Sequence, residues 1–144
     1  EFLVATNPGM PAGPLSKIAS GGELSRLMLA LKLTLIEVEQ VPTLIFDEVD
    51  SAIGGATANA VGERLARLAE RTQVLVVTHS PQVAARGTDH LRVEKTALGN
   101  EAITGVDRLG DKDRREEVAR MLSGARITSE ARAAADRLIV GDGA

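Results

Sequence analysis

Two neighbouring carboxylates end an apolar run near the middle of the chain. The run extends from Thr43 to Asp50, and its first residues favour burial without polar alternation until Asp47 and Glu48. This pattern predicts a parallel strand covered on both faces, with the acids at its carboxyl end. Ligands of open α/β sheets bind at that end, because the loops that leave the strands converge on a crevice. The pair could therefore hold a metal ion and activate a water, unless the strand simply reaches solvent and ends in ordinary polar residues.

A second candidate site lies at the start of a predicted helix, in the four consecutive residues Ser20, Gly21, Gly22 and Glu23. Serine at a helix cap with glutamate three residues later is a capping box, which satisfies free backbone amides and needs no function. That interpretation leaves the two glycines unexplained, since each costs about 1 kcal/mol relative to alanine in a helix interior. Glycines in the first turn let a phosphate approach bare amides at the positive end of the helix. The pair of glycines therefore favours an anion site.

His79 is the third candidate. It ends the run from Gln73 to His79, which is apolar until its polar carboxyl end and predicts a second buried strand. A lone histidine is more often a satisfied polar residue than a catalytic one, and on those grounds His90 is interpreted as a surface or edge residue. The strand of His79 should neighbour the strand that carries the acids, so its imidazole would reach the same crevice. There it could bond to a phosphate oxygen or polarise a water.

The elements that must position these residues alternate between helix and strand. Apolar residues at helical spacing predict one helix from Ser20 to about Glu39, and a second helix opens at Gly54. Strand, helix and strand then form a βαβ unit with a right-handed crossover. The predicted fold is α/β, with a mostly parallel sheet flanked by helices.

The last third of the sequence predicts a β-hairpin at the sheet edge and two helices. Apolar and polar residues alternate from His90 to Glu94 and from Ala102 to Val106, on either side of a turn. A helix from Asp111 to Leu122 should stop at Gly124. Thr128 is a candidate cap for the final helix.

The composition limits the possible classes of protein. The 144 residues, of which 44% are hydrophobic, suffice for one ordinary domain with a core. The lack of cysteine excludes thiolate metal sites, and a net charge of −3 with 1% aromatic residues gives no footprint for direct nucleic-acid contact by this segment. The charged run from Asp111 to Glu117 is interpreted as a solvated helix face. No run has membrane-spanning length and the sequence opens at Glu1 without methionine, so we expect a soluble, cytoplasmic segment cut from a longer chain.

Three stretches together resemble, in order and spacing, the second half of an ABC-type ATPase head: Ser20 to Arg26, Leu44 to Asp50, and Val77 to Gln82. Asp-Glu-Val-Asp differs from the Asp-Glu-Pro-Thr of transporters, and Ser-Gly-Gly-Glu differs from their Ser-Gly-Gly-Gln. Both differences point to the SMC-like branch, and within it to bacterial proteins of double-strand-break repair. The resemblance covers most of the chain up to about Ala85.

The resemblance implies roles for the residues at the strand ends. Asp47 would hold Mg²⁺, and Glu48 would serve as general base or position the attacking water. His79 would contact the γ-phosphate of ATP. Metal, carboxylate and imidazole are suited to phosphoryl transfer, which depends on positioning and charge stabilisation.

The remaining matched residues would act at a dimer interface. The signature loop, with Ser20, Gly21, Gly22 and Glu23, would contact the nucleotide held by a second head. Ser51 to Gly54 would form the D-loop at the same interface. Gly54 stands where many relatives have aspartate, so no role is carried over that needs a carboxylate at this position.

One part of an ATPase head is missing from the sequence. No Gly-x-x-x-x-Gly-Lys-Ser/Thr occurs, so the loop that cradles the β- and γ-phosphates is absent. SMC-like proteins split the head around a long coiled coil, so the resemblance implies that residues 1–144 are the carboxyl-terminal half. The implied partners are the amino-terminal half, a second head in an ATP-dependent homodimer, the coiled coil and, for the whole nucleoid-associated protein, DNA. The alternatives are a non-catalytic interaction module and a nucleotide-binding segment of another ABC ATPase.

Overall fold

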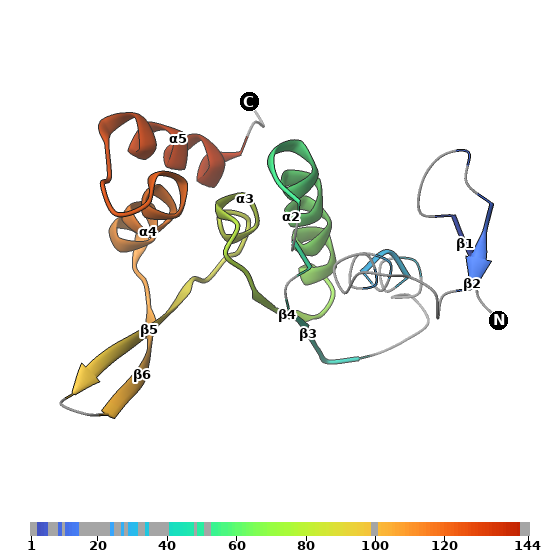
Figure 1. Cartoon of the computed structure of the whole chain (residues 1–144), viewed down its shortest axis with the longest axis horizontal. Coiled ribbons are helices and arrows are strands. Elements are labelled where there is room, and N and C mark those ends of the chain that lie inside the picture. Colours follow the sequence, from blue (N-terminus) through green and yellow to red (C-terminus); the bar gives the residue numbers. More distant parts are fainter. Residues whose placement is uncertain are drawn as a thin grey trace. The chain divides into compact units, whose positions relative to one another are not determined.

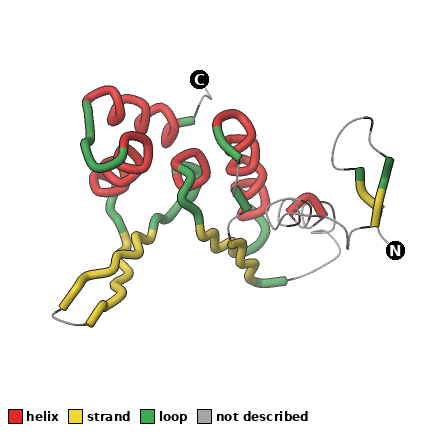
Figure 2. Tube along the Cα trace, in the orientation of Figure 1, coloured by secondary structure: helices red, strands yellow, loops and turns green. Residues whose placement is uncertain are grey.

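The structure is a computed structural model that describes residues 3–5, 9, 11–14, 24, 27, 29–31, 34, 41–47, 49–50, 53–98 and 101–141. The chain divides into two compact units, residues 1–78 and 79–144, which are described separately. Figure 1 labels the elements in chain order, and Figure 2 separates helices from strands along the trace.

The first unit begins with a short antiparallel pair, β1 (Leu3–Val4) and β2 (Gly13–Pro14). The predicted helix that follows is confirmed at its described positions, since residues 24, 27, 29–31 and 34 are helical. Leu29 on this helix is only 2% exposed, so the helix contributes to the core of the unit.

The predicted βαβ unit is present as β3 (Thr43–Asp47), α2 (Gly55–Ala69) and β4 (Gln73–Val77), with the two strands paired in parallel. Helix α2 packs against β4. Its apolar side chains recur three and four residues apart, which puts them on one face of the helix. The buried apolar members of that face are Ala58, Val61, Leu65 and Leu68.

In the part of the chain that the structure describes, one face of the β3–β4 pair is exposed, so the prediction of a strand buried on both faces is wrong. Phe46 is 8% exposed, whereas Ile45, Leu75 and Val77 are 70%, 43% and 59% exposed. Successive side chains of a strand point to opposite faces, so Ile45 and Phe46 lie on different faces of the pair. The apolar run predicted burial of both faces, and the described residues bury the side chain of Phe46 and leave Ile45 exposed.

The second unit contains a short helix, the hairpin and two longer helices. In chain order these are α3 (Pro81–Ala84), β5 (Leu91–Leu98), β6 (Glu101–Arg108), α4 (Asp111–Ser123) and α5 (Ser129–Val140). The predicted hairpin is confirmed, although β5 begins one residue later than expected and continues past Glu94 to Leu98, and β6 extends beyond both predicted ends. Among the described residues it forms a two-stranded sheet of its own rather than the edge of a larger one.

The core of the second unit is built mainly from alanine. Its buried members come from the turn after α3 and from α4 and α5, and they are Ala85, Val118, Ala119, Ala131 and Ala135. Larger side chains close the edges of this cluster, among them Leu122 and Leu138. Small side chains at facing positions let two helices approach closely.

Both predicted helix ends in this unit are confirmed. Thr128 caps α5, since its hydroxyl oxygen accepts a hydrogen bond from the Ala131 amide at 3.2 Å. Gly124 follows α4 with φ 75°, a left-handed conformation that glycine adopts without steric cost. No helix among the described residues is both long and apolar enough to cross a bilayer.

Candidate functional site

The carboxyl ends of β3 and β4 lie at the same level. Asp47, the last residue of β3, is paired with Val77, the last residue of β4, and both side chains are exposed. The chain leaves β3 toward Val49 and Asp50 and leaves β4 toward Thr78. The prediction that the two strands are parallel neighbours whose carboxyl ends lie at one edge of the sheet is confirmed.

The segment after β3 turns inward immediately. Val49 is fully buried and Asp50 is 1% exposed. The Ile53 amide donates to the Asp50 carbonyl oxygen at 3.2 Å, which closes a turn before α2 begins. Asp47 is exposed, whereas Val49 and Asp50 are buried, so the described residues after β3 turn from solvent into the core of the unit.

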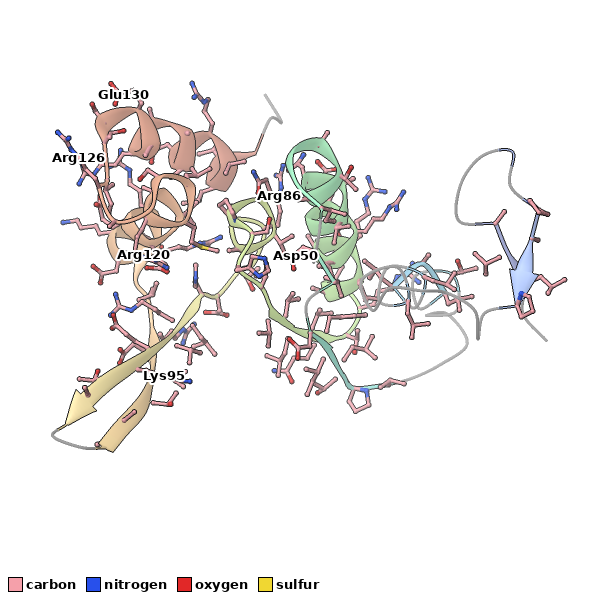
Figure 3. All side chains as sticks on the ribbon, viewed as in Figure 1. Asp50, Arg86, Lys95, Arg120, Arg126 and Glu130 are labelled. Atoms are coloured by element: carbon pink, nitrogen blue, oxygen red, sulfur yellow. The ribbon has the colours of Figure 1, made fainter. Side chains whose placement is uncertain are left out.

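Asp50 is a residue of this site to which the sequence analysis gave no role of its own. The Thr78 hydroxyl donates a hydrogen bond to its Oδ2 atom, which joins the segments that follow β3 and β4. Asp50 is labelled in Figure 3. Its Oδ1 atom is buried and has no hydrogen-bond partner among the residues that the structure describes. The sequence signal for this contact is Asp50 itself, the third acid after an apolar strand. A buried acid at that position needs a hydrogen-bond donor, which a neighbouring strand can supply.

His79 follows Thr78 directly and is the first residue of the second unit. Its side chain is exposed. The next residue, Ser80, is 7% exposed and its hydroxyl donates to Gln82 Oε1 at 2.9 Å, in the first turn of α3. His79 is therefore an accessible imidazole, and the side chains of its two neighbours, Thr78 and Ser80, are hydrogen-bonded.

His90, which was set aside as a surface or edge residue, lies just before β5 and is partly buried. Burial lowers the pKa of His90, an effect that the nearby Glu117 carboxylate partly opposes. A neutral imidazole is favoured at this position. The structure gives no reason to add His90 to the site.

Gly54 is accommodated in an ordinary extended conformation, with φ −150°, directly before α2. A Cβ atom built at Gly54 would meet no atom within 4 Å, so the aspartate that many relatives carry would fit here. The next residue, Gly55, has φ 55°, which disfavours any side chain.

Six predicted site residues fall outside the described part of the chain: Ser20, Gly21, Gly22, Glu23, Glu48 and Ser51. The signature loop and the general base therefore stay predictions. Of the predicted site residues, the structure describes Asp47 and His79.

The described residues fit a lightly held magnesium ion rather than a closed metal cage. They contain no group of three or more His, Asp or Glu side chains placed to share a metal. Mg²⁺ keeps several waters and is usually bound through one or two carboxylates together with substrate phosphates. The exposed carboxylate of Asp47 at a strand end has the hard oxygen donors and the open surroundings that such binding needs.

The charged run on α4 is exposed from Asp111 to Asp113, as the sequence predicted, but its later residues are partly or fully buried and form ion pairs. Arg115 bonds to Asp136 of α5 at 2.5 Å, and Glu116 accepts from Arg132 of α5 at 2.8 Å. Glu117 is 8% exposed and is bonded to Arg120. The expectation failed because helix α5 supplies arginine and aspartate partners that lie far along the sequence.

Comparisons with known proteins find a matching family model and closely similar sequences. A family model described as the RecF/RecN/SMC N terminal domain matches residues 15–101, more than half of the chain. The protein named DNA repair protein RecN of Xylella fastidiosa (strain 9a5c) is 52% identical over 139 residues, which are 96% of this chain and 25% of the relative. The relative of that name in Streptomyces coelicolor is 50% identical over 139 residues, 96% of this chain and 24% of its own length. The chain thus spans about a quarter of the length of these curated relatives.

A solved structure supports the same placement at the level of the fold. It comes from work described as structural biochemistry of ATP-driven dimerization and DNA stimulated activation of SMC ATPases. The match has a TM-score of 0.57 at 17% identity and covers 82% of this chain and 70% of that chain. The expected α/β fold of an SMC-type ATPase head is confirmed by this likeness. From the family match and the closely related sequences, the chain belongs to the RecF/RecN/SMC N terminal domain family.

Proposed function

We propose that residues 1–144 form the carboxyl-terminal half of an ATPase head that acts in the repair of DNA double-strand breaks. The observation that carries this proposal is the parallel register that ends β3 and β4 at one level, with Asp47 on one strand and Val77 on the other. The acid pair Asp47 and Glu48 lies at the end of the first strand, and Thr78 and His79 follow the second strand. Related proteins named DNA repair protein RecN support the repair context.

The hydrolytic roles follow from the chemistry of the side chains. Asp47 binds Mg²⁺, which neutralises developing phosphate charge when ATP is present. Glu48 takes the proton of the attacking water or orients that water. His79, exposed after β4, donates to an oxygen of the γ-phosphate. Each group stabilises charge or fixes geometry, which is most of what phosphoryl transfer requires.

The site is incomplete within these residues, so the proposal includes the missing half of the head. The sequence lacks a phosphate-binding loop with its lysine. The uncovered face of β3–β4, with Ile45 and Val77 exposed, is the surface on which that half packs. The matched family model is described as an N-terminal domain, so the carboxyl-terminal assignment rests on the order of motifs in this sequence. On the same basis, residues 1–144 are one segment of the head domain.

A second head completes the catalytic arrangement. Ser20, Gly21, Gly22 and Glu23 bind the nucleotide of that second head, and Ser51 lies at the same dimer interface. ATP therefore drives the association of two heads, and hydrolysis releases them. The likeness to a structure studied for ATP-driven dimerization of SMC ATPases supports this arrangement.

In the cell we place the whole protein in the cytoplasm, on nucleoid DNA. The coiled coil and the DNA contacts belong to parts of the parent protein beyond this segment. The chain carries a net charge of −3, which gives little electrostatic attraction to the DNA backbone.

The deciding experiment measures ATP turnover by the full-length protein that contains this segment. Glu48→Gln keeps the size of the side chain and removes its ability to accept a proton. We expect turnover to fall by about 100-fold or more while ATP binding persists. Ala69→Gln, an exposed change at the end of α2, is the control. Unchanged turnover in Glu48→Gln would contradict the assignment of the base.

A non-catalytic interaction module is the competing outcome of the same experiment. It predicts no ATP turnover by the wild-type protein and no ATP-dependent association of heads. Association is measured by light scattering with and without ATP and Mg²⁺. Turnover that stops in Glu48→Gln, together with ATP-dependent dimers, excludes the interaction module.

A further inference from the structure

The carboxylate of Asp50 is buried in a way that strand geometry alone does not require. The residue is 1% exposed, and its neighbour Val49 is fully buried. Its Oδ1 atom has no donor among the described residues, so the Thr78 hydroxyl is the donor that the structure gives to this side chain. Burying a carboxylate is unfavourable unless hydrogen bonds replace its contacts with water, so the hydrogen bond from Thr78 compensates part of this cost.

The Asp50–Thr78 hydrogen bond joins two segments that are 28 residues apart in the sequence. Asp50 lies three residues beyond the end of β3, and Thr78 is the first residue beyond β4. Because Asp47 and Val77 are paired, both segments leave the sheet from the same level. The hydrogen bond therefore holds the segment after β3 close to the segment after β4, just beyond the last strand pair, Asp47 and Val77.

Each exit carries one of the groups proposed to act on ATP. Glu48 lies between Asp47 and Val49 on the first exit, and His79 follows Thr78 by one peptide bond on the second. A side chain next to a tethered residue has fewer accessible backbone conformations than one on a free loop. Catalytic groups need such restraint, since small misplacements of the reacting groups slow reactions strongly.

We infer that Asp50 is a positioning residue, which acts through the Thr78 hydroxyl to hold the backbone that carries His79 for the hydrolytic step. This inference rests on the ATPase function proposed above. Asp50 touches neither substrate nor metal in this role. Its effect belongs to turnover rather than to ATP affinity, because the restrained groups matter most when charge develops on the γ-phosphate.

The test uses Thr78→Val in the full-length protein, a change that removes the hydroxyl and preserves the shape of the side chain. We expect kcat to fall by about 10- to 100-fold, with the Kd for ATP within about twofold of the wild-type value. Thr78→Ser restores the donor and should recover most of the turnover. Thr43→Val is the matched control, because the Thr43 hydroxyl bonds to Gln73 at the opposite ends of the same strands.

A second measurement separates positioning from a general structural role. Thr78→Val is combined with His79→Ala, and hydrolysis is followed under single-turnover conditions so that slow rates stay readable. If the hydroxyl acts through His79, the valine change has little further effect in this background. An equal loss in both backgrounds, or a Kd for ATP that rises in proportion to the loss of turnover, would overturn the inference.

The possible failures can be told apart. If Glu48→Gln and His79→Ala leave turnover intact, the proposed function of those residues fails. If both lower turnover while Thr78→Val stays within about twofold of wild type, the positioning role of Asp50 alone is wrong.

Discussion

Asp47 and Val77 form the last residue pair of the parallel ladder between β3 and β4. This pairing brings the exits of two strands, distant in the sequence, to one level at the carboxyl edge. The neighbouring Asp50–Thr78 hydrogen bond then ties those exits together. The proposed chemistry depends on this edge, and the following predictions test it and the elements that support it.

The signature loop should act on the nucleotide of the opposite head. Ser20→Arg places a bulky cation where a phosphate would approach, so we expect turnover to fall by about 100-fold with ATP binding preserved. Ala133→Arg, an exposed change in the middle of α5, is the control.

Mixing variants tests the trans arrangement directly. A dimer of one Ser20→Arg head and one Glu48→Gln head keeps a single intact composite site. An equimolar mixture of the two inactive variants should therefore recover about a quarter of wild-type turnover, because half of the dimers are mixed and each has one working site. A mixture as inactive as its components would show that the loop and the base serve the same head.

The uncovered face of β3–β4 should be buried in the whole protein. We expect Ile45→Lys to lower the free energy of unfolding of the full-length protein by about 2 kcal/mol or more, since a charge would enter an apolar interface. Urea denaturation measures this change. Ala69→Lys, at an exposed position on α2, should alter stability by less than about 0.5 kcal/mol. Equal, small effects of both changes would mean that the face stays open to water.

Two adjacent glycines before and at the start of α2 should respond differently to the same substitution. Gly54→Asp fits an extended backbone with free space around it, and aspartate is a good helix cap, so stability should hold or rise by a few tenths of a kcal/mol. Gly55→Asp forces a side chain into φ 55° and should cost about 1–2 kcal/mol. Urea denaturation of both variants compares them, and equal stabilities would contradict the described backbone.

The Glu117–Arg120 pair should make α4 sensitive to acid. The hydrogen bond from Arg120 holds the pKa of Glu117 below its ordinary value of 4.5. A carboxyl with a lowered pKa in the folded state stabilises the fold above its unfolded pKa, and that stabilisation is lost as the pH falls through the folded value. Protection of α4 amides against hydrogen exchange, corrected for intrinsic rates, should decrease below about pH 4.5.

Two variants with opposite charge changes control this experiment. Glu117→Gln removes the titrating group and Arg120→Gln removes its donor (Figure 3). Both should flatten the dependence of α4 protection on pH. A flattening in only one of them would point to net charge rather than to the pair.

The sequence predicted those features that depend on neighbouring residues. The cap at Thr128 and the stop at Gly124 follow from local backbone chemistry, and both were confirmed. The hairpin followed from alternation, and the parallel strands followed from apolar runs of suitable length. Each of these signals is complete within a few consecutive positions.

Features made by distant residues were missed for a physical reason. The donor to Asp50 is 28 residues away, and the partner of Arg115 is 21 residues away. Neither residue type nor spacing reveals which polar side chains meet across such intervals. The burial of Ile45 was also mispredicted. An apolar side chain favours burial, but its type does not show which segment would cover it.

The hairpin β5–β6 has a consequence for handling the segment apart from its parent protein. Among the described residues it stands as a two-stranded ribbon, with Val93 opposite Val106 and both more than half exposed. Open strand edges beside valines invite intermolecular pairing, and charged residues such as Glu94 and Lys95 oppose it by repulsion (Figure 3). Replacing those charged residues with neutral ones should cause the isolated segment to aggregate through pairing of its β5–β6 hairpins.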